Sequence, residues 1–407
     1  MTANGRAFAE GAGGLRSVSA GARPQGQRDH NERLILSSLQ RAGPLPGSDL
    51  ARLAGLSPQA VSVILRGLEA EGLVARGEPQ RGRVGKPRVP VALDPDGVLS
   101  LGLKLGRRSA DLLLADFAGR VRGQVQCTYR WPVPEAILRF LRDGIAALTA
   151  GLPSAQAERI AGIGVAQPFQ IWTWHEALGA TPEALSEWHG LDLAAEVGRF
   201  STLPVFIEND GTAACRAEHV YGRGREFRDF AYLFVGSFVG GGVVLDHSVF
   251  EGSSRNAGAL GSLPARAPDG SERQLLDTAS LYLLEDALAR AGVDTGRMWA
   301  MPQDWSGFGA PLDAWIARTG AELARAAATL CAVIDFEAVL IDGACPPEVR
   351  GRLVEEARAE LARLDTRGLS PIRIEAGRVG GNARALGAAT APVFARFLLN
   401  THGRADG

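Results

Sequence analysis

The chain has 407 residues, of which 46% are hydrophobic and 22% charged, and its net charge is −1 at pH 7. This length exceeds what one hydrophobic core usually serves, so two or three domains are expected. No apolar stretch approaches the roughly 18 residues that span a bilayer, and the first residues lack an apolar signal core. The four cysteines form no CxxC pair, which argues against a disulfide framework and a cysteine zinc site. We therefore expect a cytoplasmic protein that does not enter a membrane.

Charge is distributed unevenly along the chain. Between His30 and Leu93 there are nine Lys and Arg residues against five Asp and Glu residues, while the rest of the chain is acidic on balance. A positive domain on a neutral body is typical of proteins that bind nucleic-acid phosphates. Solvated surfaces give such counts by chance as well, so the pattern is supporting evidence only.

The first 94 residues contain two predicted segments. Residues 1–29 are rich in Gly, Ala, Ser and Arg without apolar periodicity, which predicts a disordered arm. Residues 30–94 predict a winged helix-turn-helix domain with three helices. Ser48 is the expected N-cap of the second helix, and Ser57, followed by a proline, opens the third. Two strands on either side of a hairpin rich in Gly and Arg complete this domain.

The third helix and the hairpin carry residue types that bind DNA. Polar residues at the start of such a helix suit the major groove, where Gln and Arg side chains bond to base edges. A basic hairpin can enter the minor groove of DNA or bind its phosphates. The residues predicted to contact DNA are Ser57, Gln59, Ala60, Ser62, Val63, Arg66, Arg81, Arg83, Lys86 and Arg88. The alternatives are a helical protein-interaction module and a winged helix used for dimerisation.

From residue 95 onward, predicted strands alternate with helices, which indicates an α/β body. Strands are predicted at residues 98–105, 111–117, 160–165, 205–207, 230–236, 241–245, 339–343 and 372–375. The body contains two similar halves, each led by a hairpin, as a diverged duplication would. We divide it into a first lobe at 95–215, a second lobe at 216–390, and a C-terminal helix end and tail at 391–407.

Several short motifs follow one another in a characteristic order. They are the Gly-Lys-Pro of the basic hairpin at 85–87 and the segments at 163–168, 208–214, 218–222, 236–242, 257–261, 341–343 and 387–389. In this order and spacing they resemble the repressor branch of the ROK family, over about residues 31–392. The resemblance implies a two-lobed actin/hexokinase-like fold behind the winged helix-turn-helix, with a sugar cleft between the lobes. The implied partners are operator DNA and a sugar or polyol effector, and we expect a homodimer or homotetramer.

Departures from the family pattern argue against phosphoryl transfer. Lys104 lies where ATP-binding members have an acidic residue, and Arg107 and Arg108 replace a Gly-rich turn over the phosphates. Phosphoryl transfer depends on such positioning, so we expect no enzyme activity and no nucleotide or other cofactor. Ser262 replaces the zinc-binding His of the family, and no cysteine follows before Cys331, which predicts that no metal is bound.

Asn209 and Asp210 are the main predicted effector ligands, because an amide and a carboxylate entering a helix suit adjacent hydroxyls. In the kinases of the family, the residue that matches Asp210 is the general base. The alternative is that the pair only caps its helix. The other predicted effector contacts are Gln167, Gln170, Trp172, His175 and Asp277.

Four residues qualify this prediction. Ala259 replaces a sugar-binding Glu of the family, so the effector is expected to differ from the usual hexoses and acetylamino sugars. Trp172 stacks on a sugar face in this interpretation, whereas in the alternative it packs beneath a surface loop. His219 and His247 have no ligand partners near them in sequence and are expected to be structural or surface residues.

Taken together, these features predict a sequence-specific transcriptional regulator of carbohydrate metabolism, with repression as its mode of action. One alternative is an active sugar kinase with an added DNA-binding domain, against which Lys104 and Arg107 argue. The other is a constitutive DNA-binding protein whose cleft is vestigial.

Overall fold

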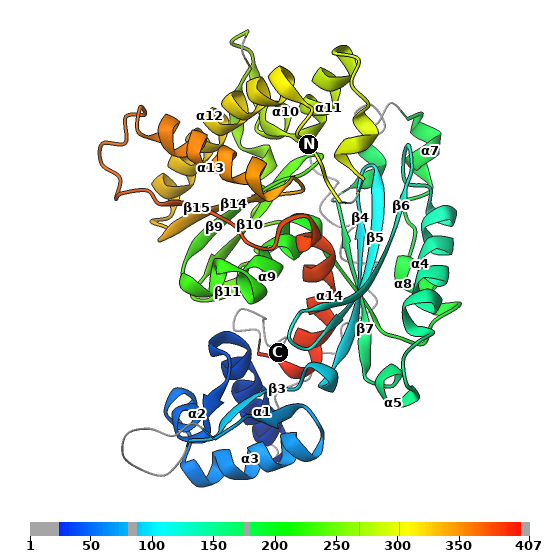
Figure 1. Ribbon diagram of the computed structural model, residues 1–407, viewed down its shortest axis with the longest axis vertical. Helices are drawn as coiled ribbons and strands as arrows, with labels where there is room; N and C mark the ends of the chain where they lie inside the picture. The colour runs from blue at the N-terminus through cyan, green and yellow to red at the C-terminus, as the bar shows by residue number, and fades with distance from the viewer. Residues whose placement is uncertain are drawn as a thin grey trace.

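The computed structural model describes residues 24–79, 88–168, 170–174, 180–267, 269–300 and 302–399. An N-terminal domain lies at one end of the molecule, and two lobes, each built on a sheet, lie beyond it (Figure 1). The C-terminal helix α14 (Ala383–Phe397) runs between the lobes toward the N-terminal domain. In the described part of the chain, no helix combines the length and the apolar character needed to cross a membrane.

Three helices and a small antiparallel sheet form the N-terminal domain. They are α1 (Pro24–Ala42), β1 (Leu45–Pro46), α2 (Gly47–Ala54), α3 (Pro58–Ala70), β2 (Val74–Arg76) and β3 (Pro90–Leu93). The strand order in this sheet is β1-β3-β2. The element order is that of a winged helix-turn-helix, as predicted. Helix α1 begins inside the segment that was expected to be a disordered arm.

The two predicted helix caps have different outcomes. The Ser57 Oγ accepts a hydrogen bond from the Ala60 N–H at 3.2 Å, and Pro58 is the first residue of α3, as predicted. The prediction that Ser48 caps the second helix is wrong, since α2 begins at Gly47 and Pro46 is its N-cap residue. Pairing of β1 with β3 extends to Pro46, so the helix starts directly behind the strand.

The N-terminal domain shares its hydrophobic core with the body. Ile35 and Leu50 of this domain are buried in one cluster with Phe117, Ala161 and Val393 of the body. Because such interiors are close-packed, a shift on one side of the cluster displaces the other. The two parts therefore form a mechanically continuous structure in this conformation.

The first lobe is a five-stranded sheet with helices on its outer side. Its strands are β4 (Leu99–Leu105), β5 (Ser109–Asp116), β6 (Val121–Thr128), β7 (Ile160–Gln167) and β8 (Val205–Asn209), in the order β6-β5-β4-β7-β8. Its helices are α4 (Pro134–Thr149), α5 (Ser154–Ala157), α7 (Pro182–Ser186) and α8 (Leu193–Gly198). The sequence analysis missed β6, an edge strand whose many polar side chains obscure the strand pattern.

The second lobe has a mixed five-stranded sheet. Its strands are β9 (Phe230–Val235), β10 (Val239–Leu245), β11 (Ser248–Val249), β14 (Ala338–Gly343) and β15 (Ile374–Ala376), in the order β11-β10-β9-β14-β15. Around it lie α9 (Asp210–Tyr221), α10 (Leu276–Ala279), α11 (Leu281–Arg290), α12 (Gly309–Val333), α13 (Pro347–Leu361) and the hairpin of β12 (Pro264–Arg266) and β13 (Glu272–Gln274). β10 begins at Val239, two residues earlier than predicted, because Val239 pairs with Val235.

Helix α14 packs closely on the first lobe through glycines. A Cβ at Gly102 of β4 would lie 2.0 Å from the Ala385 carbonyl oxygen, and one at Gly164 of β7 would lie 1.7 Å from that of Ala388. Only glycine permits this approach of a helix to a sheet. The predicted second lobe at 216–390 contains most of α14, and this helix packs on α9 through Gly387 as well as on β4 and β7 of the first lobe. The chain returns to the first lobe at its end, and sequence order did not reveal this return.

Candidate functional site

The outer face of α3 is exposed along its whole length. α3 lies on the side of the N-terminal domain that is turned away from the two lobes (Figure 1). Gln59, Ser62 and Arg66 are exposed, and 61% of the Val63 surface is accessible to solvent. Ser57 is exposed as well, and Ala60 is half-buried. This face combines hydrogen-bonding side chains with one exposed apolar side chain, a combination that suits the edges of DNA bases.

The hairpin beside α3 is described only at its base. Arg81, Arg83 and Lys86 lie outside the described residues. Arg88 is exposed, and its Nη1 lies 3.9 Å from the Asp49 Oδ2 of α2.

The strand before the hairpin is linked to α3 by an ion pair. The Arg76 Nε of β2 donates to the Glu69 Oε1 of α3 at 2.9 Å. This contact orients the hairpin base relative to the outer face of α3.

Polar contacts join the N-terminal domain to the body beside the shared core. The Arg159 guanidinium donates to the Gly97 and Glu71 carbonyl oxygens at 2.9 and 3.2 Å. Arg33 of α1 donates to the Ala395 carbonyl oxygen of α14 at 3.1 Å. α14 therefore contacts the N-terminal domain directly through its C-terminal half.

An ion pair at the start of α9 and α14 lies between the two sheets. The Arg384 Nη1 of α14 is 3.2 Å from the Asp210 Oδ2 at the first residue of α9. The Arg384 guanidinium also lies over the Phe234 ring, 4.9 Å from its centroid. A Cβ at Gly236 would lie 3.3 Å from the Arg384 Nη2, so this arginine covers the start of the loop between β9 and β10.

Asn209 acts as the N-cap of α9. Its Oδ1 accepts hydrogen bonds from the Gly211 N–H at 2.9 Å and from the Thr212 N–H at 3.2 Å. This geometry agrees with the capping alternative for Asn209. Gln167 pairs with Asn209 across β7 and β8, so both residues lie at the carboxyl ends of neighbouring parallel strands. Ligands of open α/β sheets commonly bind at such ends.

A second ion pair lies on the neighbouring strands β4 and β5. The Lys104 Nζ lies 2.7 Å from both the Asp111 Oδ2 and the Ser109 Oγ, and Gln126 donates to the Asp111 Oδ1 at 2.6 Å. Burial lowers the pKa of Lys104, and the nearby Arg384 acts in the same direction, while Asp111 opposes both. Together with Arg384 and Asp210 this pair forms what we call the interlobe site, in which cations and carboxylates alternate.

The turn after β4 contacts the second lobe through two arginines. Arg107 is buried, and its guanidinium carbon lies 5.0 Å from the Phe238 ring centroid and 5.2 Å from that of Tyr282. The Arg108 Nε lies 3.5 Å from the Glu285 Oε1 of α11. Burial lowers the pKa of Arg107. Bulky cationic side chains thus occupy the space between this turn and the loop that contains Phe238.

The other predicted effector residues are less clearly grouped. Gln170 is exposed, and its carbonyl oxygen accepts from the Thr173 N–H at 2.9 Å. The Trp172 ring packs edge-on against His189 at 5.2 Å, within the first lobe. Asp277 in the first turn of α10 accepts from the Gln274 N–H at 3.2 Å. His175 lies outside the described residues. The structure thus brings together Gln167, Asn209 and Asp210, whereas Trp172 and Asp277 make these contacts within their own lobes.

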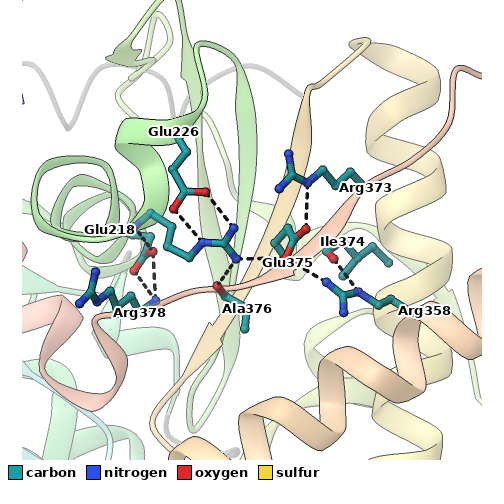
Figure 2. A network of polar contacts seen from close by, with 9 residues as sticks. Glu218, Glu226, Arg358, Arg373, Ile374, Glu375, Ala376 and Arg378 are labelled. Carbon is teal, nitrogen blue, oxygen red and sulfur yellow. Dashed lines mark hydrogen bonds and ion pairs between the residues drawn. The ribbon is translucent and has the colours of Figure 1, made fainter.

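Two buried carboxylates that the sequence analysis did not single out hold the segment before α14. Glu218 of α9 accepts hydrogen bonds from the backbone N–H groups of Arg223 at 2.8 Å and of Arg378 at 3.0 Å (Figure 2). It also accepts one from the Val379 N–H at 3.0 Å. Asp342 of β14 accepts from the Gly380 N–H at 2.9 Å. Burial raises the pKa of Glu218, and the Asp342 charge adds to this rise. Glu218 and Asp342 lie in the motifs at 218–222 and 341–343. Their place in these motifs was the only feature of the sequence that pointed to them.

Surface ion pairs extend this network over β15. Arg223 pairs with Glu226 at 2.8 Å and with Glu375 at 3.0 Å, and Glu375 also binds Arg358 and Arg373 (Figure 2). These contacts tie β15 to α13 and to the end of α9. They fix the path of the chain into α14, and with it the position of Arg384. Among the described residues, no group of three or more His, Cys, Asp and Glu side chains could hold a metal ion.

Two family models and several known proteins match this chain. A model of the ROK family matches residues 100–273, and a model of the MarR family matches residues 29–83. The uncharacterized protein y4fQ of Sinorhizobium fredii is 28% identical over 90% of this chain and 92% of its own length. The xylose repressor of Bacillus subtilis is 24% identical over 57% of this chain and 60% of its own length. The transcriptional dual regulator NagC of Escherichia coli is 23% identical over 57% of each chain.

Solved structures show the same fold. The ROK family transcriptional regulator described as a homolog of the Escherichia coli MLC protein superposes with a TM-score of 0.62 at 20% identity, over 91% of this chain and 96% of its own. The ROK family glucokinase of Streptomyces griseus, in complex with glucose and AMPPNP, gives 0.55 at 19% identity, over 72% of this chain and 98% of its own. The match to the named repressors spans about 60% of their length. The chain therefore combines a ROK family domain with an N-terminal winged-helix domain of the MarR type.

Proposed function

We propose that this protein is a sequence-specific DNA-binding repressor of carbohydrate genes, whose DNA affinity is set by a sugar or polyol bound at the interlobe site. The observation that carries this proposal is the exposed outer face of α3 on a domain whose core continues into the two-lobed body. The named repressors among the relatives support the same function. A homodimer would present two such faces to successive major grooves of a near-palindromic operator.

The predicted DNA contacts divide into two groups. Gln59 and Arg66 on α3 bond to base edges in the major groove and carry sequence preference, with Ser57, Ala60, Ser62 and Val63 fitting around them. Arg88 and the hairpin residues Arg81, Arg83 and Lys86 bind phosphates or the minor groove, so they carry affinity rather than sequence preference.

Helix α14 offers a physical route between the two functions. Its 15 residues span roughly 22 Å. Arg384 in its first turn pairs with Asp210, and Ala395 near its other end accepts a hydrogen bond from Arg33 of the N-terminal domain. Sugar hydroxyls that bind Asp210 compete with Arg384 and release that end of the helix. A shift of α14 then alters the placement of the N-terminal domain, and the coupling equals the difference in effector affinity between the two arrangements.

The same residues argue against phosphoryl transfer. The positively charged Lys104 is paired with Asp111 where ATP-binding members need an acidic residue to position magnesium. Arg107 lies between the turn after β4 and the ring of Phe238, and Arg384 covers the start of the loop between β9 and β10. A nucleotide would need backbone N–H groups of these two segments to approach its phosphates. We therefore propose that the body binds a carbohydrate and transfers no phosphate to it.

DNA binding is tested by selecting sequences from a random duplex library with the full-length protein. We expect the selected duplex to bind roughly 10³-fold more tightly than a scrambled duplex, as is common for sequence-specific proteins. A protein that binds both duplexes equally would contradict sequence-specific regulation. Salt titration on the selected duplex measures how many phosphates are contacted.

The effector site is tested by a carbohydrate screen, first for thermal stabilisation of the protein and then for release of the selected duplex. In Asp210→Ala, we expect the duplex to bind normally and the effector to lose its influence. Asp143→Ala, an exposed position on α4, is the matched control and should respond to the effector as the parent protein does. If the effector releases the duplex from Asp210→Ala as it does from the parent protein, Asp210 is not an effector ligand. Sugar-dependent ATP turnover by the parent protein would support the kinase alternative instead.

A further inference from the structure

A cavity lies where the N-terminal domain meets the body, apart from the interlobe site. Ser37, Gln40 and Arg41 of α1 form one wall, and residues of α9, of the turn between β10 and β11, and of the end of α14 form the others. The cavity itself has a volume of about 30 Å³, and it opens to solvent, so that the space including its mouth is about 580 Å³. The cavity is bridged at its rim by a hydrogen bond from the Gln40 Nε2 to the Val220 carbonyl oxygen at 2.8 Å.

The cavity is lined by an excess of basic side chains. Arg41, Arg216, Arg225, His219 and His247 all line it. Arg216 is neutralised, because it lies 3.1 Å from Glu208 and 3.0 Å from Glu251. Within the described ranges, no carboxylate lies within 4.0 Å of the charged nitrogens of Arg41 or Arg225. Among the described residues, these two guanidinium groups, one from each side of the junction, therefore have no carboxylate at ion-pair distance, while the Arg225 Nε donates to the Val220 carbonyl oxygen at 2.5 Å.

His219 responds to this positive environment. Its pKa is lowered to about 3, first by burial and then by the charges of Arg41, Arg216 and Arg225, which act in the same direction. Burial also lowers the pKa of Arg225. A neutral His219 still offers one hydrogen-bond donor to an anion.

The backbone at His247 has an unusual conformation. His247 and the preceding Asp246 have φ angles of 57° and 50°, in the left-handed region that non-glycine residues seldom adopt. They form the two-residue connection between β10 and β11, where Leu245 pairs with Ser248. Both central residues of a two-residue hairpin turn of type I′ have such angles, so the hairpin itself accounts for them. Here the turn places His247 and Ser248 on the cavity wall.

We propose that this junction cavity binds a small oxyanion, a phosphate or carboxylate group of a metabolite, between Arg41 of the N-terminal domain and Arg225 of the body. Guanidinium groups bind both kinds of oxyanion through charge-assisted hydrogen bonds. The apolar wall of Val249, Phe394 and Leu398 fits the carbon skeleton that carries the anionic group. Because the ligand contacts both parts, it fixes the placement of the N-terminal domain. Only this effect on DNA rests on the proposed function; the site itself does not.

The experiment titrates the full-length protein with inorganic phosphate at constant ionic strength, and follows binding by calorimetry and thermal stability. We expect saturable binding that Arg41→Gln and Arg225→Gln each weaken by about tenfold or more, the usual effect of removing a hydrogen bond to a charged group. Arg41 is exposed, so its variant keeps the test valid should Arg225→Gln impair folding. Arg367→Gln removes the same charge at an exposed site in the loop after α13 and should bind phosphate as the parent does.

Glucose 6-phosphate and gluconate, with glucose as the neutral control, identify the source of the anionic group. Tighter binding of glucose 6-phosphate than of gluconate indicates that the ligand is a sugar phosphate. Tighter binding of gluconate indicates that it is a sugar acid. Absence of saturable binding for all three anions would overturn the proposal, and so would equal affinities in Arg41→Gln and Arg367→Gln. A protein that binds phosphate at this cavity but shows no sequence preference for DNA would support the site and contradict the proposed function.

Discussion

The outer face of α3 and the interlobe site differ in how their polar side chains are satisfied. On α3, the side chains of Gln59 and Ser62 are exposed to solvent. Within the described part of the chain, Arg66 donates to its own helix, at 3.3 Å from the Ser62 carbonyl oxygen. At the interlobe site, by contrast, Asp210 is paired with Arg384 and Lys104 with Asp111. The first surface is available to a partner as it stands, whereas the second offers polar groups that already bind one another.

This difference has a thermodynamic consequence. A macromolecule that binds α3 displaces mainly water, while a sugar that binds Asp210 must replace an internal ion pair. The cost of replacing that pair lowers the apparent affinity, and it also links ligand binding to a change in structure. In the proposed function, the ion pair of Asp210 with Arg384 is therefore the element through which effector binding moves α14. The following predictions test whether α14 connects the two regions and how each region is held.

The largest effect is expected at the glycine contact between β7 and α14. In Gly164→Ala, the added Cβ would lie 1.7 Å from the Ala388 carbonyl oxygen, so the helix must move away from the sheet. We expect a loss of about 3 kcal/mol in the free energy of unfolding, in the range of severe overpacking. Chemical denaturation measures it, with Gly151→Ala, where no atom lies within 4 Å, as the control. Equal stability of the two variants would mean that α14 does not depend on this contact.

The next effect concerns recognition by α3. Arg66→Ala should reduce discrimination between the selected duplex and its single-base variants by about 2 kcal/mol at one base pair, because a bidentate base contact is lost. Competition binding over a set of such variants measures this loss. Arg52→Ala, an exposed arginine of α2, serves as the control and should leave the preference unchanged. If both variants lose affinity equally for every sequence, Arg66 contacts phosphate and not a base.

A smaller effect is expected where the two lobes meet. Arg107→Ala removes the contacts with the Phe238 and Tyr282 rings and should lower the free energy of unfolding by about 1.5 kcal/mol. Arg139→Ala, at an exposed position on α4, should have little influence on stability. We also expect no ATP turnover in Arg107→Ala, because Lys104 still pairs with Asp111. Turnover that emerges in this variant would show that Arg107 alone suppresses kinase activity.

The smallest effect depends on pH. The pKa of His219 is lowered to about 3 in the folded state, where it faces Arg41, Arg216, Arg225 and His247. Below the unfolded pKa of roughly 6.5, the unfolded chain therefore binds a proton that the folded chain does not. Stability should fall as the pH is lowered from 7 to 5.5, by about 1 kcal/mol from this group.

The pH effect is measured as the difference between the parent protein and His219→Gln, which should show a smaller decrease over the same range. His189→Gln, which changes a histidine of the first lobe, controls for the loss of an imidazole elsewhere. Identical pH profiles for the parent protein and His219→Gln would mean that His219 titrates normally in the folded state.

Local signals in the sequence determined much of the fold. Ser57 and Pro58 predicted the start of α3, because an N-cap hydroxyl and a proline act within one turn of their own helix. The apolar strands that became β4, β5, β7 and β9 were also predicted, since buried strands consist of nearly continuous apolar residues. The outward side of α3 followed from helical periodicity alone. These features depend on neighbours in the sequence, so no knowledge of the tertiary structure was needed.

The tertiary structure decided the contacts between residues that lie far apart in the chain. The pairing of Arg384 with Asp210 joins positions 174 residues apart, and α14 returns to the first lobe through Gly102 and Gly164. The junction cavity likewise takes Arg41 from α1 and Arg225 from the segment after α9. Periodicity and capping carry no information on such distances, because long-range pairing depends on how complete elements pack. The sequence therefore determined which surfaces exist, and the packing of α14 decided which of them meet.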